Sequence, residues 1–141
     1  SAISKTSAFE HRMQPRNING AWIIDDTYNG NLEGFKAGLC LLSELDAKRK
    51  IYVTPGLVDQ GEETQRVHYE IAKAINNANP NIVVLMKNEN TEFIYGVLQE
   101  LKFSGQIIME TNPLEYYKNI DQFIAAGDLI LMQNDLPDAY S

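Results

Sequence analysis

Short apolar segments alternate along most of the chain with segments of helical periodicity, and this alternation constrains the fold more than any other feature. The apolar segments are nearly continuous, which is typical of strands that are covered on both faces. They are Ala21–Asp25, Ile51–Thr54, Ile82–Met86, Gln106–Met109 and Leu129–Met132. Strands that alternate with helices favour right-handed crossovers and a mainly parallel sheet. We therefore predict an α/β fold: a three-layer sandwich built on a Rossmann-like, mainly parallel sheet.

Four segments between these strands carry apolar residues at three- and four-residue spacing, as one face of a helix does. The first helix is predicted over Leu32–Asp46, and Cys40 on it is expected to be a small core residue. The third helix is expected to end at Ser104-Gly105, in the manner of a glycine C-cap. The fourth begins at Asn112-Pro113, an N-cap followed by a first-turn proline. Its apolar residues would be Leu114, Tyr117, Ile120, Phe123 and Ile124.

An antiparallel hairpin is predicted at one edge of the sheet. Asn19-Gly20 is a strong signal for a two-residue turn because both residues tolerate positive φ. Pro15 confines the preceding segment, His11–Ile18, to an edge strand or ends it early. Residues 1–10 show no periodicity and are expected to be a linker or an expression remnant, which leaves residues 11–141 as one domain. The chain begins without an initiator methionine, which is consistent with a piece of a longer protein.

Charge and composition exclude several classes of partner. The 141 residues include 12 basic and 19 acidic residues, for a formal net charge of −7. The longest basic run is Lys48–Lys50, so we expect no nucleic-acid partner. No apolar run approaches the roughly 20 residues of a membrane span, and the single cysteine suits a reducing compartment. These observations predict a cytoplasmic, acidic, single-domain protein with no nucleic-acid partner and no membrane partner.

Two acids and two amides crowd the exit of the first core strand, in the segment Asp25–Asn31. Ligands of α/β proteins bind at the carboxyl ends of the strands. One interpretation is a turn in which Asp26 or Asn29 caps the next helix. The other is a binding site in which one acid accepts hydrogen bonds from a ribose or binds Mg²⁺ while the other holds it in place. The residues leave both interpretations open.

A second candidate site is the loop Thr54–Glu63, which contains two glycines at another strand exit. Glycines allow a ligand to approach the backbone closely, but a plain turn whose acids favour the next helix would give the same pattern. His68 on that helix is expected to be a half-exposed surface residue unless it is a ligand. Arg12 in the edge hairpin is a surface charge unless it points at an anion.

Taken together, these motifs resemble the C-terminal domain of the Mur ligases. The resemblance is carried by His11-Arg12-Met13, by Ile23–Asn31, by the acidic loop Pro55–Glu63 and by His68. It runs from about His11 to Met132. It is greatest to the type that adds D-alanyl-D-alanine to UDP-N-acetylmuramoyl-tripeptide.

The resemblance implies an ATP-dependent amide ligase of peptidoglycan precursor synthesis, of which this chain would be the closing domain. ATP and Mg²⁺ would be held mainly by a central ATPase domain of the same polypeptide, which would also have an N-terminal UDP-sugar domain. Arg12 would reach the phosphates of ATP, and Asp26 would bind the ribose hydroxyls. The partners would be small-molecule substrates, and the residues that bind them would be Asp25, Tyr28, Asn29, Asn31, Gly56, Asp59 and His68. No catalytic residue and no metal ligand is expected in this domain, which alone would be inactive.

Two alternatives remain open. The chain could belong to a Mur-ligase-like paralogue that joins a different acid and amine. It could also be a stand-alone α/β binding or regulatory module without catalysis.

Overall fold

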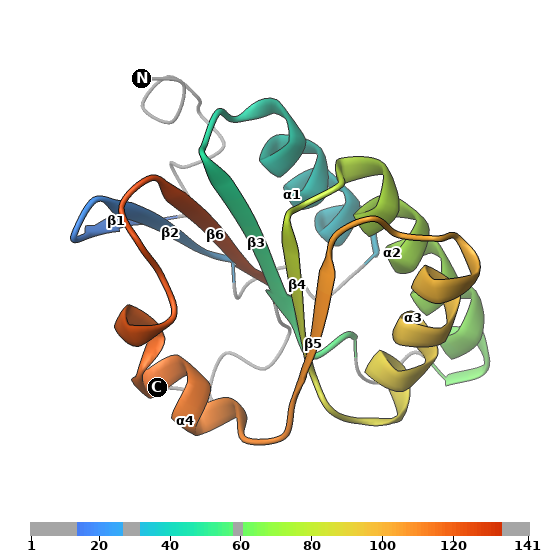
Figure 1. Cartoon of the computed structure of the whole chain (residues 1–141). Helices are drawn as coiled ribbons and strands as arrows, with labels where there is room; N and C mark the ends of the chain where they lie inside the picture. Colours follow the sequence, from blue (N-terminus) through green and yellow to red (C-terminus); the bar gives the residue numbers. More distant parts are fainter. Residues whose placement is uncertain (1–13, 27–31, 58–60, 134–141) are drawn as a thin grey trace.

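The computed structural model describes residues 14–26, 32–57 and 61–133, which form a six-stranded sheet in the order β1-β2-β6-β3-β4-β5 (Figure 1). The strands are β1 (Gln14–Ile18), β2 (Ala21–Asp26), β3 (Arg49–Thr54), β4 (Ile82–Met86), β5 (Gln106–Glu110) and β6 (Asp128–Gln133). Only the edge pair β1–β2 is antiparallel among the pairs formed by these strands. The predicted mainly parallel sheet with an antiparallel edge hairpin is confirmed.

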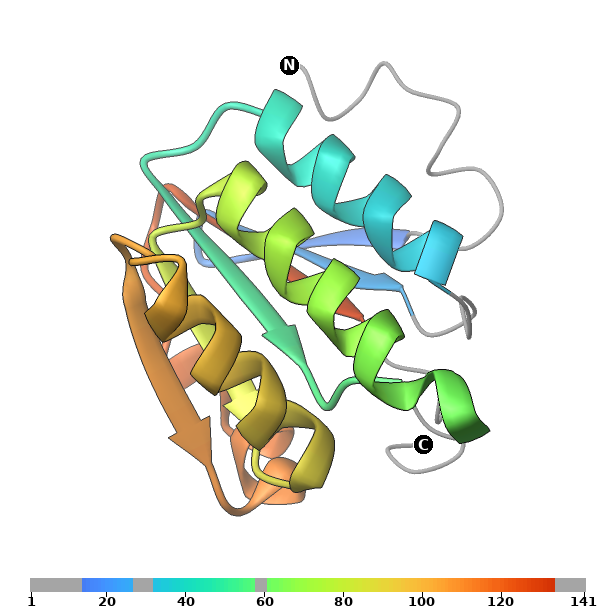
Figure 2. The same cartoon turned by 90° about the vertical axis from the view of Figure 1, so that its right-hand side faces the viewer.

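Three helices cover one face of the sheet and lie side by side (Figure 2). They are α1 (Leu32–Glu44), α2 (Thr64–Ala78), which follows the short 3₁₀ helix η3 (Gly61–Glu63), and α3 (Glu89–Glu100). The connections from β2 to β5 all advance in one direction across the sheet, so right-handed crossovers bring these helices to the same face. The connection from β5 back to β6 runs the other way. It therefore carries α4 (Pro113–Lys118) and η4 (Ile120–Gln122) over the opposite face (Figure 1).

The core lies in two layers, one on each side of the sheet. Successive strand residues point to opposite faces, so Tyr52 and Leu131 pack under the helices α1–α3 while Val53 and Ile130 pack against α4 and η4. Every residue of β6 is buried. The predicted three-layer arrangement is confirmed, with a thin layer on the second face.

The fourth helix is shorter than predicted. The α-helix ends at Lys118, and a 3₁₀ turn replaces its continuation. Leu114 and Phe123, predicted as core residues, are 59% and 48% exposed, whereas Tyr116 is 5% exposed. Phe123 instead stacks on Tyr116 with ring centroids 4.8 Å apart. Burial, helped by the nearby Glu110 charge, raises the pKa of Tyr116 to about 12.

Two further expectations are wrong. Cys40 is exposed because the buried stripe of α1 runs through Gly38, Leu39 and Leu42, and a residue advances about 100° around the helix at each step. The third helix does not end at Ser104-Gly105. It ends at Glu100, and Lys102 adopts the left-handed conformation, with φ of 58°.

An ion pair joins the amino ends of the neighbouring strands β3 and β6. Arg49 Nε donates to Asp128 Oδ1 at 3.0 Å, and Arg49 Nη2 donates to Asp128 Oδ2 at 2.6 Å. The backbone N–H of Ala125 also donates to this carboxylate, at 2.8 Å. Burial raises the pKa of Asp128, but these hydrogen bonds and the Arg49 charge lower it by more, so the net pKa lies below its ordinary value.

Replacing Asp128 by Asn (Asp128→Asn) is expected to lower the free energy of unfolding of the 141-residue chain by about 2 kcal/mol at neutral pH, because a charged hydrogen-bond partner is lost. A lowered folded-state pKa stabilises the protein above the unfolded pKa of about 4, and this contribution is lost as pH falls through the folded pKa. The difference between variant and wild type should therefore shrink below pH 4, as measured by urea unfolding.

The matched control is Glu63→Gln, because Glu63 forms an ion pair with Arg66 in which both side chains are about 60% exposed, at 61% and 59%. This substitution should change stability by less than about 1 kcal/mol. An equal loss for Asp128→Asn at pH 7 and pH 2 would show that its charge is not responsible.

Candidate functional site

The two loops that the sequence singles out begin at the same edge of the sheet, separated by one strand. Asp25 and Asp26 pair with Met132 and Gln133 of β6, and on the other side Val53 of β3 pairs with Met132. At the usual strand spacing the exits of β2 and β3 are about 10 Å apart. The carboxyl edge thus brings together the Asp-Asp motif and the glycine loop.

Five of the predicted site residues lie outside the described residues. They are Arg12, Tyr28, Asn29, Asn31 and Asp59. Asp26 is the last residue of β2, and Asp25 before it is half-buried. Gly56 and His68 are fully described and can be placed in atomic detail.

A buried polar network holds the amino-terminal half of α1 over the end of β6. Gln133 is 0% exposed, and its side-chain oxygen accepts a hydrogen bond from the Tyr52 hydroxyl at 2.8 Å. Its side-chain nitrogen donates to the carbonyl of Gly34 at 3.2 Å. A Cβ on Gly38 would lie 2.1 Å from that nitrogen, so a larger residue at this position would displace the Gln133 side chain. The network fixes the position of the amino-terminal half of α1 relative to β6.

The first residues after β3 run through the interior. Pro55, Gly56 and Leu57 are all buried, and buried backbone groups require partners. The Gly56 N–H donates to Thr54 Oγ1 at 3.1 Å. The Pro55 carbonyl accepts from Asn88 Nδ2 at 2.9 Å and the Leu57 carbonyl from Asn90 Nδ2 at 3.0 Å.

His68 completes this set from α2, and it is 0% exposed, contrary to the expectation of a half-exposed surface residue. Its Nε2 accepts the Leu57 N–H at 3.0 Å, and its Nδ1 lies 2.7 Å from the carbonyl of Thr64. Both ring nitrogens therefore bond to backbone atoms. Gly56 has φ of +84°, and a Cβ there would lie 3.0 Å from His68 Nε2, so the open side of this glycine is occupied by the ring.

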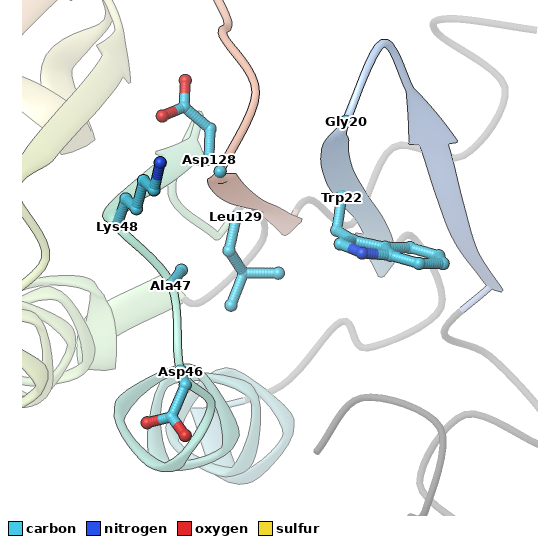
Figure 3. Close-up of a pocket in the computed structure, with 8 residues that line it drawn as sticks. Gly20, Trp22, Asp46, Ala47, Lys48, Asp128 and Leu129 are labelled. Atoms are coloured by element: carbon cyan, nitrogen blue, oxygen red, sulfur yellow. The ribbon is translucent and has the colours of Figure 1, made fainter. Parts of the chain in front are cut away.

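A hollow of about 480 Å³ lies at the opposite, amino edge of the sheet. Its lining includes Trp22 of β2 on one side and Leu129, Lys48 and Asp46 on the other (Figure 3). The carboxylate of Asp128 on its wall is already paired with Arg49. Because ligands of parallel sheets bind at the carboxyl ends of the strands, the carboxyl edge, where Asp25 and Asp26 lie, remains the better candidate site.

The described part of the chain contains neither a metal-binding cluster nor a membrane-spanning helix. Within residues 14–26, 32–57 and 61–133, no group of three or more His, Cys, Asp or Glu side chains is arranged to hold a metal ion. The helices of these ranges include none that is long and apolar enough to cross a membrane.

Several residues of the edge were not predicted. Asn88 caps α3 and forms a capping box with Thr91, a pattern that its three-residue spacing could have revealed. The partners of Asn90, Tyr52 and Gln133 carry no local signal, because each lies more than 30 residues away in sequence.

The chain matches the model of a known protein family. The family described as "Mur ligase, glutamate ligase domain" matches residues 11–136 of the chain. The chain belongs to this family. The match includes both strand exits at the carboxyl edge and the helix that carries His68. A search of curated proteins found no significant match.

Solved Mur ligases share the fold. The MurF ligase of Thermotoga maritima in complex with ADP has a TM-score of 0.69 at 22% identity, over 89% of this chain and 27% of that chain. A MurF structure from Acinetobacter baumannii has a TM-score of 0.65 at 14% identity, over 86% of this chain and 26% of that chain. The UDP-N-acetylmuramate-alanine ligase MurC of Thermotoga maritima has a TM-score of 0.54 at 18% identity, over 82% of this chain and 24% of that chain. The chain therefore spans about a quarter of the length of each of these three ligases.

Replacing Gly38 by Ala (Gly38→Ala) should destabilise this Mur ligase domain by about 1–3 kcal/mol, because the new methyl group would displace Gln133 from Tyr52 and Gly34. Gly96→Ala in α3 is the matched control, since a Cβ there meets no atom within 4 Å. It should stabilise the domain by about 0.5–1 kcal/mol through helix propensity. Urea unfolding measures both, and equal effects at the two positions would contradict the proposed packing.

Proposed function

We propose that this chain is the C-terminal, closing domain of an ATP-dependent carboxylate–amine ligase of Mur type that acts in cytoplasmic peptidoglycan precursor synthesis. The observation that carries the proposal is the position of the family's Asp-Asp segment. Asp25 and Asp26 end β2 beside the buried strand β6, at the edge where parallel sheets bind ligands. The proposal is supported by the family match over residues 11–136.

On this proposal, Arg12 and Asp26 contact ATP. A guanidinium suits the phosphates because it is always charged and presents several donors in one plane. A carboxylate suits the ribose because it can accept hydrogen bonds from both hydroxyls. ATP and Mg²⁺ would be bound mainly by the central ATPase domain of the same polypeptide, next to an N-terminal UDP-sugar domain. Binding of a nucleotide in this family is illustrated by the related MurF ligase, whose structure contains ADP.

The incoming amine would be bound at the same edge. The groups proposed for it are Asp25, Tyr28, Asn29, Asn31 and Asp59, whereas Gly56 and His68 are buried. Carboxylate and amide oxygens accept the hydrogen bonds of an amine. The ligase would transfer the γ-phosphoryl group of ATP to a carboxylate with release of ADP, and the amine would then attack the acyl phosphate and release inorganic phosphate. Closure of this domain would exclude water, which otherwise hydrolyses the acyl phosphate. D-Alanyl-D-alanine is the first amine to test.

Replacing Asp26 by Ala (Asp26→Ala) in the complete ligase should raise the KM for ATP by about 10- to 100-fold, because charged hydrogen bonds to the ribose are lost. Steady-state kinetics with UDP-N-acetylmuramoyl-tripeptide and D-alanyl-D-alanine measure this. Asp46→Ala, an exposed acid at the other edge of the sheet, is the control and should leave KM unchanged. Wild-type kinetics for Asp26→Ala would exclude the ribose role.

Replacing Arg12 by Ala (Arg12→Ala) should lower kcat on the order of 10²-fold, because the guanidinium would no longer stabilise charge on the transferring phosphoryl group. Arg16→Ala is the matched control, since Arg16 is exposed on β1. The same assay, followed by release of inorganic phosphate or ADP, tests both variants. Unchanged turnover for Arg12→Ala would make Arg12 an ordinary surface charge.

A further inference from the structure

The segment that leaves β3 is held by side chains rather than by a neighbouring strand. His68, Asn88 and Asn90, here called the loop clamp, come from α2 and from the turn and helix after β4. They bond to backbone atoms of Pro55 and Leu57 at distances of 2.9 to 3.0 Å. Loops normally lie on the surface, where water satisfies their backbone groups. This one enters the core, and the clamp replaces that water.

The hydrogen bonds of the His68 ring determine which of its two nitrogens carries the proton. The Leu57 N–H can only donate, so Nε2 must be the accepting nitrogen. The ring proton then lies on Nδ1, which donates to the carbonyl of Thr64 at 2.7 Å. With both nitrogens bonded and an exposed fraction of 0%, His68 has no free polar atom to offer a ligand.

The same ring reaches both ends of the loop between β3 and α2. Leu57 lies three residues after the end of β3, and Thr64 is the first residue of α2. The Thr64 hydroxyl in turn donates to the Gly61 carbonyl at 2.7 Å, which closes the turn at the helix end of the loop. Gly56 lets the chain pass against the ring, as any side chain there would meet His68 or Asn90. The two ends of the loop are thus fixed relative to each other by one imidazole.

We propose that His68 is a positioning residue for the amine-binding edge of the ligase. It contacts no substrate; it holds the exit of β3 in place through Leu57 and Thr64, and Asn88 and Asn90 complete the restraint. The inference rests on the proposed function, because it assigns His68 to the loop that flanks the proposed amine site. It also reassigns Gly56, whose missing side chain makes room for His68 and not for a ligand.

Nuclear magnetic resonance on the 141-residue chain tests the clamp independently of any ligase activity. Long-range ¹H–¹⁵N spectra should show the His68 ring with its proton on Nδ1. The Leu57 amide should exchange slowly with solvent, and in His68→Leu it should exchange on the order of tenfold faster or more. A ring protonated on Nε2, or a Leu57 amide that exchanges equally fast in both proteins, would overturn the inference.

Kinetics of the complete ligase test the consequence. His68→Leu removes both hydrogen bonds and should raise the KM for D-alanyl-D-alanine on the order of tenfold, with the KM for ATP little changed. His68→Gln should restore much of the affinity, because the amide oxygen can accept the Leu57 N–H. Tyr69→Leu is the control, since Tyr69 is 41% exposed on the next position of α2.

The possible outcomes separate the two proposals. An unchanged amine KM in a folded His68→Leu ligase, or equal increases in the KM for the amine and for ATP, would overturn the positioning role. Circular dichroism melting shows whether His68→Leu is folded, and His68→Gln decides the question if it is not. A wild-type ligase that joins no amine would overturn the proposed function, and the resonance experiment alone would then decide whether the clamp exists.

Discussion

The insertion of β6 between β2 and β3 is the contact on which the candidate site depends. β6 is the last of the described strands along the chain, and all its residues are buried. Its apolar centre is compatible with more than one register, but its ends are polar. Asp128 must reach Arg49, and Gln133 must reach Tyr52 and Gly34. Because a buried polar group is costly when unpaired, these ends select one register. That register aligns the exits of β2 and β3.

The carboxyl edge contains two kinds of polar residue. The Asp-Asp end of β2 begins the segment for which ligand contacts are proposed. The residues around the exit of β3 point inward and bond to backbone. His68 and Gly56 belong to the second kind, since the ring fills the space beside the glycine. A glycine-rich loop at a strand exit can therefore reflect internal packing as well as the approach of a ligand.

Predictions from the sequence succeed where the signal is local. The strands were identified from continuous apolar runs, and the hairpin from Asn19-Gly20, because strand burial and turn conformation depend on neighbouring residues. The fourth helix was predicted too long because a 3₁₀ turn can continue the apolar spacing of the α-helix before it, as Ile120 does after Tyr116. Cys40 was misplaced because leucines occur on more than one side of α1, and the sequence does not show which side faces the sheet.

The sequence by itself determined the α/β class, the edge hairpin and the two strand exits where chemistry is expected, since each follows from residues close together in the chain. Only the tertiary structure decided that β6 separates those exits and that His68 points inward. These features depend on contacts between distant residues, 33 positions apart for Pro55 and Asn88 and 81 for Tyr52 and Gln133. No local pattern encodes such contacts, because a hydrogen bond that spans this distance forms only when the sheet has brought both partners to one edge.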